Sequence, residues 1–191
     1  MSFIGAPILV VPGWGNSGPA HWQSIWERDD PSFTRVEQSN WLSPDLTDWI
    51  GTIDRAVSRA VEPAVLVAHS LGCIAVVQWE SSRMAALGDR VRGALLVAPA
   101  DVEATSAPAA TIAFGPIPRL RLPFRSAVVA SRTDMYCTIE RAQELAGVWG
   151  SAFFDIGDAG HINVESGHGP WSAGKRYLET LLPANQGSSI L

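Results

Sequence analysis

The chain has 191 residues, of which 47% are hydrophobic and 17% charged, and its formal net charge is −5. This balance favours one globular domain with a substantial core over a disordered chain. It argues against nucleic acid or an anionic membrane as a partner, because no cluster of Lys or Arg is present to neutralise phosphates. The two cysteines, the absence of a signal-like start and the lack of a long apolar stretch predict a cytoplasmic protein that does not span a membrane.

Short apolar runs alternate with helix-like segments along the whole chain. Alternation at this spacing predicts a mainly parallel α/β sheet of about six strands with helices on both faces. One domain is expected over residues 1–183, followed by a flexible tail at 184–191. The predicted strands are 7–11, 34–37, 64–68, 93–98, 126–131 and 152–156, and the predicted helices are 19–28, 43–61, 71–86, 138–149 and 170–182.

The third predicted strand meets its helix at Ala68-His69-Ser70-Leu71-Gly72, where small residues flank a serine. A serine on a sharp turn between strand and helix is typical of the nucleophile elbow of α/β-hydrolases, usually Gly-x-Ser-x-Gly. Ala68 stands here in place of the first glycine. The alternative is that Ser70 only caps the helix, a role for which serine is well suited.

A serine nucleophile needs a histidine to take its proton and a carboxylate to orient that histidine. His161 is the favoured base because it follows the last predicted strand, at the sheet edge where the serine turn also lies. His69 adjoins the serine and is expected to pack or to form a hydrogen bond, with a place at the pocket as a further possibility. His21 is expected to be structural or to lie at the pocket, and His168 to precede the last helix.

Two aspartates compete for the role of the acid. Asp134 directly follows the fifth predicted strand, whereas Asp101 follows the fourth. Asp134 is preferred because it gives the chain order serine, acid, histidine at the expected spacing. Asp158 is nearer to His161 in sequence, which says little about their distance in space. The alternative role for Asp134 is to cap the helix that begins near Thr138.

The glycine-rich stretch after the first strand is expected to complete the site. Backbone N–H groups of Trp14 and Leu71 are the candidate donors to an oxyanion, with Gly13 at the pocket. Residues 13–18 also match Gly-x-Gly-x-x-Gly, so a dinucleotide-binding site is an alternative. Two observations argue against it: Trp14 would obstruct a pyrophosphate, and Glu37 is only a fair match to the acidic residue that binds the ribose. Cys73 and Cys137 are expected to be small buried side chains. No metal site is predicted, since no cluster of ligands has the required spacing.

Four segments together resemble the serine hydrolase family of small α/β-hydrolases, which includes the retinoblastoma-binding serine hydrolase and bacterial relatives. The resemblance implies Ser70, Asp134 and His161 as a catalytic triad, with no cofactor. Residues 99–125 leave room only for a short cover and not for a lid domain, so the pocket is expected to be shallow and open. Small carboxylic esters are therefore the expected substrates, with thioesters or amides as further possibilities. The alternative is a protein-interaction module with little or no turnover. The segments are 12–15 with 21–22, 68–72, 131–136 and 160–171.

Overall fold

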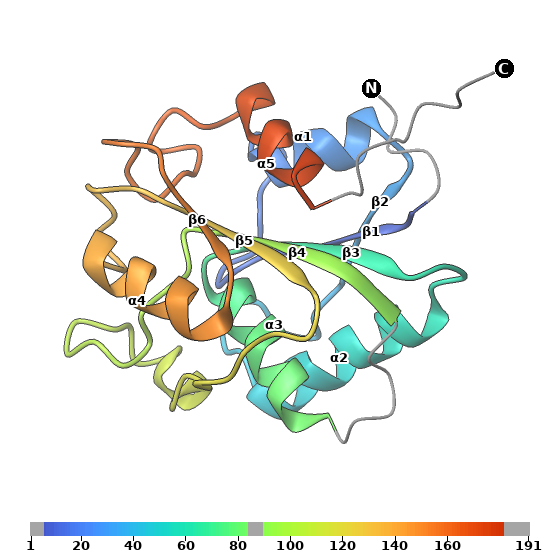
Figure 1. Cartoon of the computed structure of the whole chain (residues 1–191), viewed down its shortest axis with the longest axis horizontal. Helices are drawn as coiled ribbons and strands as arrows, with labels where there is room; N and C mark the ends of the chain where they lie inside the picture. The colour runs from blue at the N-terminus through green and yellow to red at the C-terminus, as the bar shows by residue number, and fades with distance from the viewer. Residues whose placement is uncertain (1–5, 84–89, 182–191) are drawn as a thin grey trace, which may run out of the picture.

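The computed structural model describes residues 6–83 and 90–181, so the predicted tail at 184–191 and the predicted helix end at residue 86 lie outside the described residues. Six strands form one parallel sheet in the order β2-β1-β3-β4-β5-β6 (Figure 1). The predicted parallel α/β sheet is therefore confirmed, with strand ends that differ from the predicted ones by at most two residues. The strands are β1 (Ile8–Val11), β2 (Phe33–Arg35), β3 (Ala64–His69), β4 (Val91–Val97), β5 (Arg125–Ala130) and β6 (Ala152–Asp155).

Helices cover both faces of the sheet, as predicted: α1 and α5 lie on one face, and α2, α3 and α4 on the other (Figure 1). Strands β1 and β3, and β4 from Gly93 on, are consequently buried on both sides, which explains why these stretches are mainly apolar runs rather than alternating ones. The helices are α1 (Trp22–Asp29), α2 (Leu46–Arg59), α3 (Leu71–Ser82), α4 (Ile139–Trp149) and α5 (Lys175–Glu179), with short 3-10 helices η2 (Ile112–Phe114) and η3 (Ser172–Gly174).

In α2, the longest described helix, the apolar residues that recur along the sequence form one buried face. Trp49, Ile53 and Val57 form its buried stripe, and their side chains are fully inaccessible to solvent. Helix α3 packs against α2 and against β1 and β3 of the sheet, and it is accordingly apolar on nearly all sides, with Trp79 fully buried. These contacts fix α3, and with it the serine at its first turn, on the centre of the sheet.

Four of the five helices differ from their predicted bounds by more than one residue. Helix α2 begins at Leu46 instead of residue 43 because Asp45 caps it, and α3 ends at Ser82, where Arg83 is extended. The other two differ for local reasons. Helix α1 begins at Trp22 rather than at residue 19, because His21 has an extended backbone and its side chain accepts a hydrogen bond from the N–H of Gln23. The predicted helix at 170–182 is a 3-10 turn followed by the short α5. There Trp171 has a φ of 26°, which a regular helix does not allow, and its ring packs directly on Gly174.

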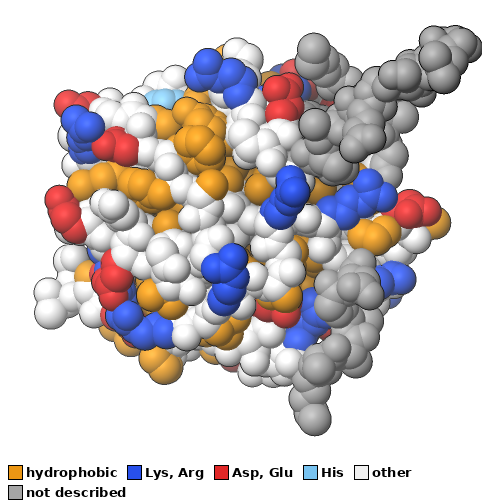
Figure 2. Space-filling model, viewed as in Figure 1, with side chains coloured by type: hydrophobic (Ala, Val, Ile, Leu, Met, Phe, Trp, Pro, Cys, Tyr) orange, Lys and Arg blue, Asp and Glu red, His pale blue; other side chains and the backbone are white. Residues whose placement is uncertain are grey.

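The segment between β4 and β5 holds only the short 3-10 helix η2, so the described chain has no inserted lid domain. None of the described helices combines the length and the hydropathy that crossing a membrane requires. On the face shown in Figure 2, the described Lys and Arg side chains lie singly or beside acidic ones and do not merge into one basic surface.

Candidate active site

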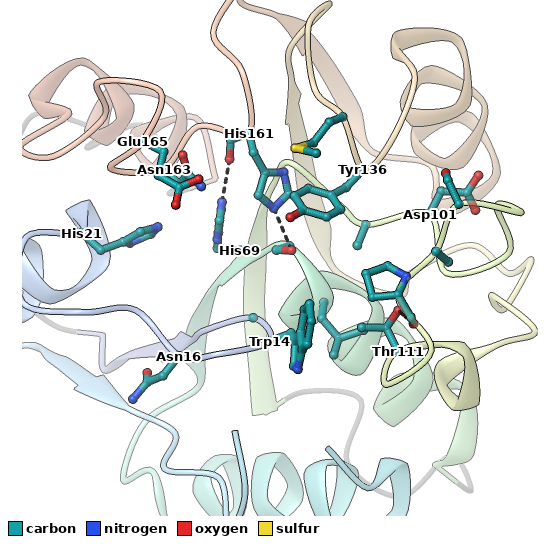
Figure 3. A pocket seen from close by; sticks show the side chains of 18 residues that line it. Trp14, Asn16, His21, His69, Asp101, Thr111, Tyr136, His161, Asn163 and Glu165 are labelled. Atoms are coloured by element: carbon teal, nitrogen blue, oxygen red, sulfur yellow. Dashed lines mark hydrogen bonds between the residues drawn. The ribbon is translucent and has the colours of Figure 1, made fainter. Parts of the chain in front are cut away.

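A cavity of about 210 Å³ lies at the carboxyl ends of the strands, lined by residues that directly follow β1, β3, β4, β5 and β6 (Figure 3). The residues that the sequence placed at a pocket, Gly13, Trp14, His21 and His69, all line it. The complete lining comprises Gly13, Trp14, Asn16, His21, His69, Ser70, Leu71, Ala100, Asp101, Ser106, Ala107, Pro108, Thr111, Met135, Tyr136, His161, Asn163 and Glu165.

Ser70 occupies a strained turn between β3 and α3. Its φ of 56° and ψ of −126° lie outside the regions that a residue with a side chain normally adopts. The turn is held by hydrogen bonds from Ser70 N–H to the Val97 carbonyl and from Cys73 N–H to the Ser70 carbonyl, each 3.0 Å long. The Ser70 side chain makes no capping hydrogen bond to α3, so helix capping does not explain this serine.

Glycines allow neighbouring backbone to approach the turn closely. A Cβ on Gly72 would lie 2.4 Å from the Val11 carbonyl oxygen and 2.6 Å from that of Pro12. A Cβ on Gly13 would lie 2.8 Å from Cβ of Ser70. Both positions require glycine because the obstructing atoms belong to the backbone or to a side-chain root, which cannot swing away.

Gly72→Ala is therefore expected to destabilise the protein by about 2 kcal/mol or more, since the end of β1 must move to admit the methyl group. Urea unfolding followed by circular dichroism measures this loss. Gly147→Ala is the matched control, because Gly147 lies in α4 with no atom within 4 Å of the added Cβ. This control should gain about 0.5–1 kcal/mol from helix propensity. Equal stability of the two variants would contradict the packing argument.

Three side chains from separate loops form one hydrogen-bonded chain. Ser70 Oγ lies 2.8 Å from Nε2 of His161, and Nδ1 of His161 lies 2.8 and 2.9 Å from the two carboxylate oxygens of Asp134. The Asp134 side chain is only 3% exposed, and it also accepts the backbone N–H of Tyr136. In this arrangement a neutral His161 donates from Nδ1 to the carboxylate and accepts the Ser70 hydroxyl proton at Nε2.

The competing acid, Asp101, does not reach His161. Its carboxylate lies 3.4 Å from Nε of Arg141 and accepts the backbone N–H of Glu103. Asp101 lines the cavity nonetheless, on the side of the β4–β5 segment. The carboxylate that meets the imidazole is Asp134, whereas Asp158 is exposed at the surface.

Backbone donors stand beside the serine. Neither the N–H of Trp14 nor that of Leu71 has an acceptor among the described residues. The two segments are close, because a Cβ on Gly13 would lie 3.2 Å from the Leu71 nitrogen. The loop carrying Trp14 is held by the hydrogen bond from Gly15 N–H to the Trp41 carbonyl, 3.0 Å long. An oxygen bound to the serine-attached carbon could accept from both free N–H groups.

Two further histidines lie in line with His161. The centroid of the His69 ring is 4.8 Å from that of His161 and 4.8 Å from that of His21. His69 donates from Nε2 to the His161 carbonyl at 2.9 Å, which fixes the backbone of the histidine loop. Burial lowers the pKa of His69 well below its usual value, and burial together with Arg35 and His161 lowers the pKa of His21 to about 4. Both rings are neutral at pH 7, so they add no like charge beside a protonated His161.

This burial makes the stability of the fold sensitive to acid. An unfolded His21 binds a proton below pH 6.5, whereas the folded one does so only near pH 4. The free energy of unfolding should therefore fall by about 3 kcal/mol for His21 alone as the pH drops through that window, and His69 acts in the same direction. Urea titrations at pH 7 and at pH 4.5 measure the loss. His21→Ser, which keeps a helix cap, should lose less stability than the wild type; an equal loss would refute this account.

Two polar side chains that were not predicted from the sequence, Gln23 and Arg35, hold the segments that carry the site. Gln23, fully buried, donates to the carbonyls of Val11 and Val67 at the ends of β1 and β3. Arg35 binds Asn16 and holds the loop after β1. Gln23 lies on the otherwise apolar face of α1, and a glutamine at such a position is the signal that could have revealed it.

The two loops that carry the acid and the histidine are tied together by short side chains. Ser131 accepts the backbone N–H of Ala159 at 2.9 Å, and Thr133 accepts that of Gly160 at 3.0 Å. Both bonds reach the residues just before His161, and both side chains lie just before Asp134. The spacing between the two partners is thus set by backbone contacts as well as by their own hydrogen bonds.

The cysteines are small buried side chains, as expected. Burial raises the pKa of Cys73 well above its usual value and that of Cys137 to about 12, so neither is a reactive thiolate. In the described part of the chain, no group of three or more His, Cys, Asp and Glu side chains is arranged to hold a metal ion.

Comparisons with known proteins agree with this architecture. A solved structure described as a YdeN-like hydrolase from Pectobacterium atrosepticum is 34% identical, with 93% of each chain covered and a TM-score of 0.79. The ydeN gene product of B. subtilis is 20% identical, with 93% of this chain and 98% of that chain covered and a TM-score of 0.72. A thermophilic esterase from Thermogutta terrifontis, 17% identical over 94% of this chain and 90% of that one with a TM-score of 0.63, shows the shared fold alone.

A comparison with curated proteins found no match. The model of the family described as serine hydrolase, in contrast, matches residues 8–180, a range that runs from β1 to the end of α5 and contains the whole site. The resemblance seen in the sequence is thereby confirmed: the chain belongs to the serine hydrolase family, with an α/β-hydrolase fold.

Proposed function

We propose that this hydrolase cleaves small carboxylic esters through an acyl intermediate on Ser70. The observation that carries the proposal is the hydrogen-bonded chain from Ser70 through His161 to Asp134, with 2.8 Å contacts at both ends. It stands beside two backbone N–H groups that have no acceptor among the described residues. A nucleophile, a base with its orienting acid and preorganised donors are the groups that acyl transfer requires.

Each group has a definite step in this mechanism. His161 Nε2 takes the hydroxyl proton as Ser70 Oγ attacks the ester carbonyl, and Asp134 stabilises the imidazolium that forms. The N–H groups of Trp14 and Leu71 donate to the oxyanion, an effect typically worth about 3 kcal/mol for each donor. Collapse breaks the ester bond as His161 gives its proton to the leaving alcohol. Water, activated by the same histidine, then attacks the acyl-serine and releases the acid.

The size of the cavity supports small substrates. Its volume of about 210 Å³ is below the ~300 Å³ at which pockets for drug-sized ligands begin. The segment between β4 and β5 covers it with a loop rather than with a lid domain. Short acyl and alcohol parts therefore fit better than long lipid chains. Thioesters and activated amides of the same size are chemically accessible to the same groups.

Two assays on the wild-type protein test this function. The first measures hydrolysis of p-nitrophenyl acetate, butyrate and octanoate, with the highest kcat/KM expected for the shorter esters. The second measures covalent labelling by a fluorophosphonate, which reports an activated serine. The rival possibility is a protein-interaction module on an inactive hydrolase scaffold. A protein that neither turns over the esters nor takes the label would support that rival and overturn the proposal.

A further inference from the structure

His21 lines the cavity beside Ser70, and its side chain carries a buried hydrogen-bond donor with no partner among the described residues. The side chain is 5% exposed, and its Nδ1 accepts the backbone N–H of Gln23 at 3.2 Å. A neutral imidazole that accepts at Nδ1 carries its proton at Nε2. This Nε2 is buried and has no hydrogen-bond partner among the described residues. Buried donors are rarely left unpaired, so an N–H that lines a cavity points to a ligand oxygen.

His69 supplies the complementary acceptor. Its Nε2 donates to the His161 carbonyl, so its Nδ1 carries no proton and can accept a hydrogen bond. No described residue donates to this Nδ1. The two rings are 4.8 Å apart, and Figure 3 shows the His21 ring directed toward His69, with Asn163 and Glu165 on the same side of the cavity. A donor and an acceptor side by side match a hydroxyl group, which both accepts and donates.

The charged side chains that line the cavity favour a neutral ligand group over an anionic one at this position. The lining contains the carboxylates of Asp101 and Glu165 but no Lys or Arg among the residues that the structure describes. Both imidazoles are neutral at pH 7, because burial lowers their pKa values. A carboxylate or phosphate would find no cation in the lining, because Arg35, whose charge acts on His21, is already paired with Glu27. A neutral hydroxyl meets only complementary groups.

We propose that His21 and His69 form a hydroxyl-binding subsite, so that the preferred substrates are small esters carrying a hydroxyl group. The proposal rests on the esterase function proposed above and narrows it. His21 contacts the substrate directly here and acts as a specificity residue, while Ser70 and His161 carry out the chemistry.

Matched ester pairs test the subsite on the wild-type protein. Glycerol monobutyrate is compared with propyl butyrate, and methyl lactate with methyl propionate, so that the hydroxyl lies in the alcohol part of one pair and in the acyl part of the other. The kcat/KM of the hydroxylated ester should exceed that of its partner by about 5-fold or more in one pair, as one good hydrogen bond provides. Equal values within both pairs would overturn the subsite while leaving the esterase function intact.

Variants assign the preference to His21. His21→Ser keeps a side-chain cap for α1 but removes the imidazole N–H, so the ratio within the responding pair should fall to about one. His21→Asn, a second capping residue with a shorter amide donor, should also lower the ratio and serves if the serine variant does not fold. His168→Ser replaces a histidine that does not line the cavity and should keep the wild-type ratio. An unchanged ratio in the folded His21 variants would overturn the assignment of the preference to His21. A wild-type protein with neither turnover nor fluorophosphonate labelling would overturn the esterase function, and the subsite with it.

Discussion

Ser70→Ala is expected to lower kcat/KM for short acyl esters by about 10⁴-fold or more and to abolish fluorophosphonate labelling. The alanine removes the Oγ that lies 2.8 Å from Nε2 of His161, so no acyl-enzyme can form. Any residual hydrolysis would come from water held near the oxyanion donors. Ester hydrolysis and in-gel labelling measure the two effects on the same preparation.

The control for this variant is Ser58→Ala. Ser58 is an exposed serine of α2 and does not line the cavity, so its replacement should leave both turnover and labelling at the wild-type level. Circular dichroism shows whether Ser70→Ala is folded, as expected for the loss of a single hydroxyl that makes no capping bond. Label that persists on folded Ser70→Ala protein would mean that another residue is the nucleophile.

Asp134→Asn is expected to lower kcat by about 10⁴-fold while leaving KM nearly unchanged. The carboxylate accepts from Nδ1 of His161 at 2.8 Å and leaves Nε2 free to take the serine proton. An asparagine can donate its amide N–H to Nδ1, which favours the tautomer protonated at Nε2, and this tautomer cannot act as the base. It also loses the negative charge that stabilises the imidazolium. Steady-state kinetics on a short acyl ester separate kcat from KM.

Asp101→Asn is the matched comparison, because it removes a cavity carboxylate that pairs with Arg141 instead of His161. Its effect on kcat should be at least about 100-fold smaller than that of Asp134→Asn, since it leaves the tautomer of His161 unchanged. A larger loss for Asp101→Asn would move the role of the acid from Asp134 to Asp101.

Local patterns in the sequence predict much of the fold. The strands β1 and β3, and the C-terminal halves of β4 and β5, are apolar runs because both faces of a parallel sheet are buried, and such runs are visible without a structure. Capping residues mark helix starts in the same way: Thr138 caps α4 at the predicted place, and Asp45 caps α2 two residues after the predicted start at residue 43. The end of the chain was predicted less well, because the φ of 26° at Trp171 depends on ring packing that no local pattern reveals.

The candidate site, like the fold, could be predicted from the sequence only in part. Each residue of the Ser70–His161–Asp134 chain directly follows a strand or lies in the loop after one, and parallel strands bring such positions to one edge of the sheet. The choice of Asp134 as the partner of His161, in contrast, depends on distances that two loops reach only in the folded chain. The support from Gln23 was missed for the same reason, since its partners are backbone carbonyls of β1 and β3.

The parallel α/β sheet could be predicted from the sequence, because strand burial, caps and glycine turns are encoded within a few neighbouring residues. The serine hydrolase family followed from the resemblance of four segments, which the family model confirms. Only the tertiary structure decided which carboxylate meets His161 and that His21 and His69 stand in line with it as neutral rings. It also shows that the cavity has a volume of about 210 Å³ and that the N–H groups of Trp14, Leu71 and His21 have no acceptor among the described residues. Hydrogen-bond partners, the burial of side chains and the volume of the cavity depend on contacts between segments that are distant along the chain. Such contacts form only when the chain folds.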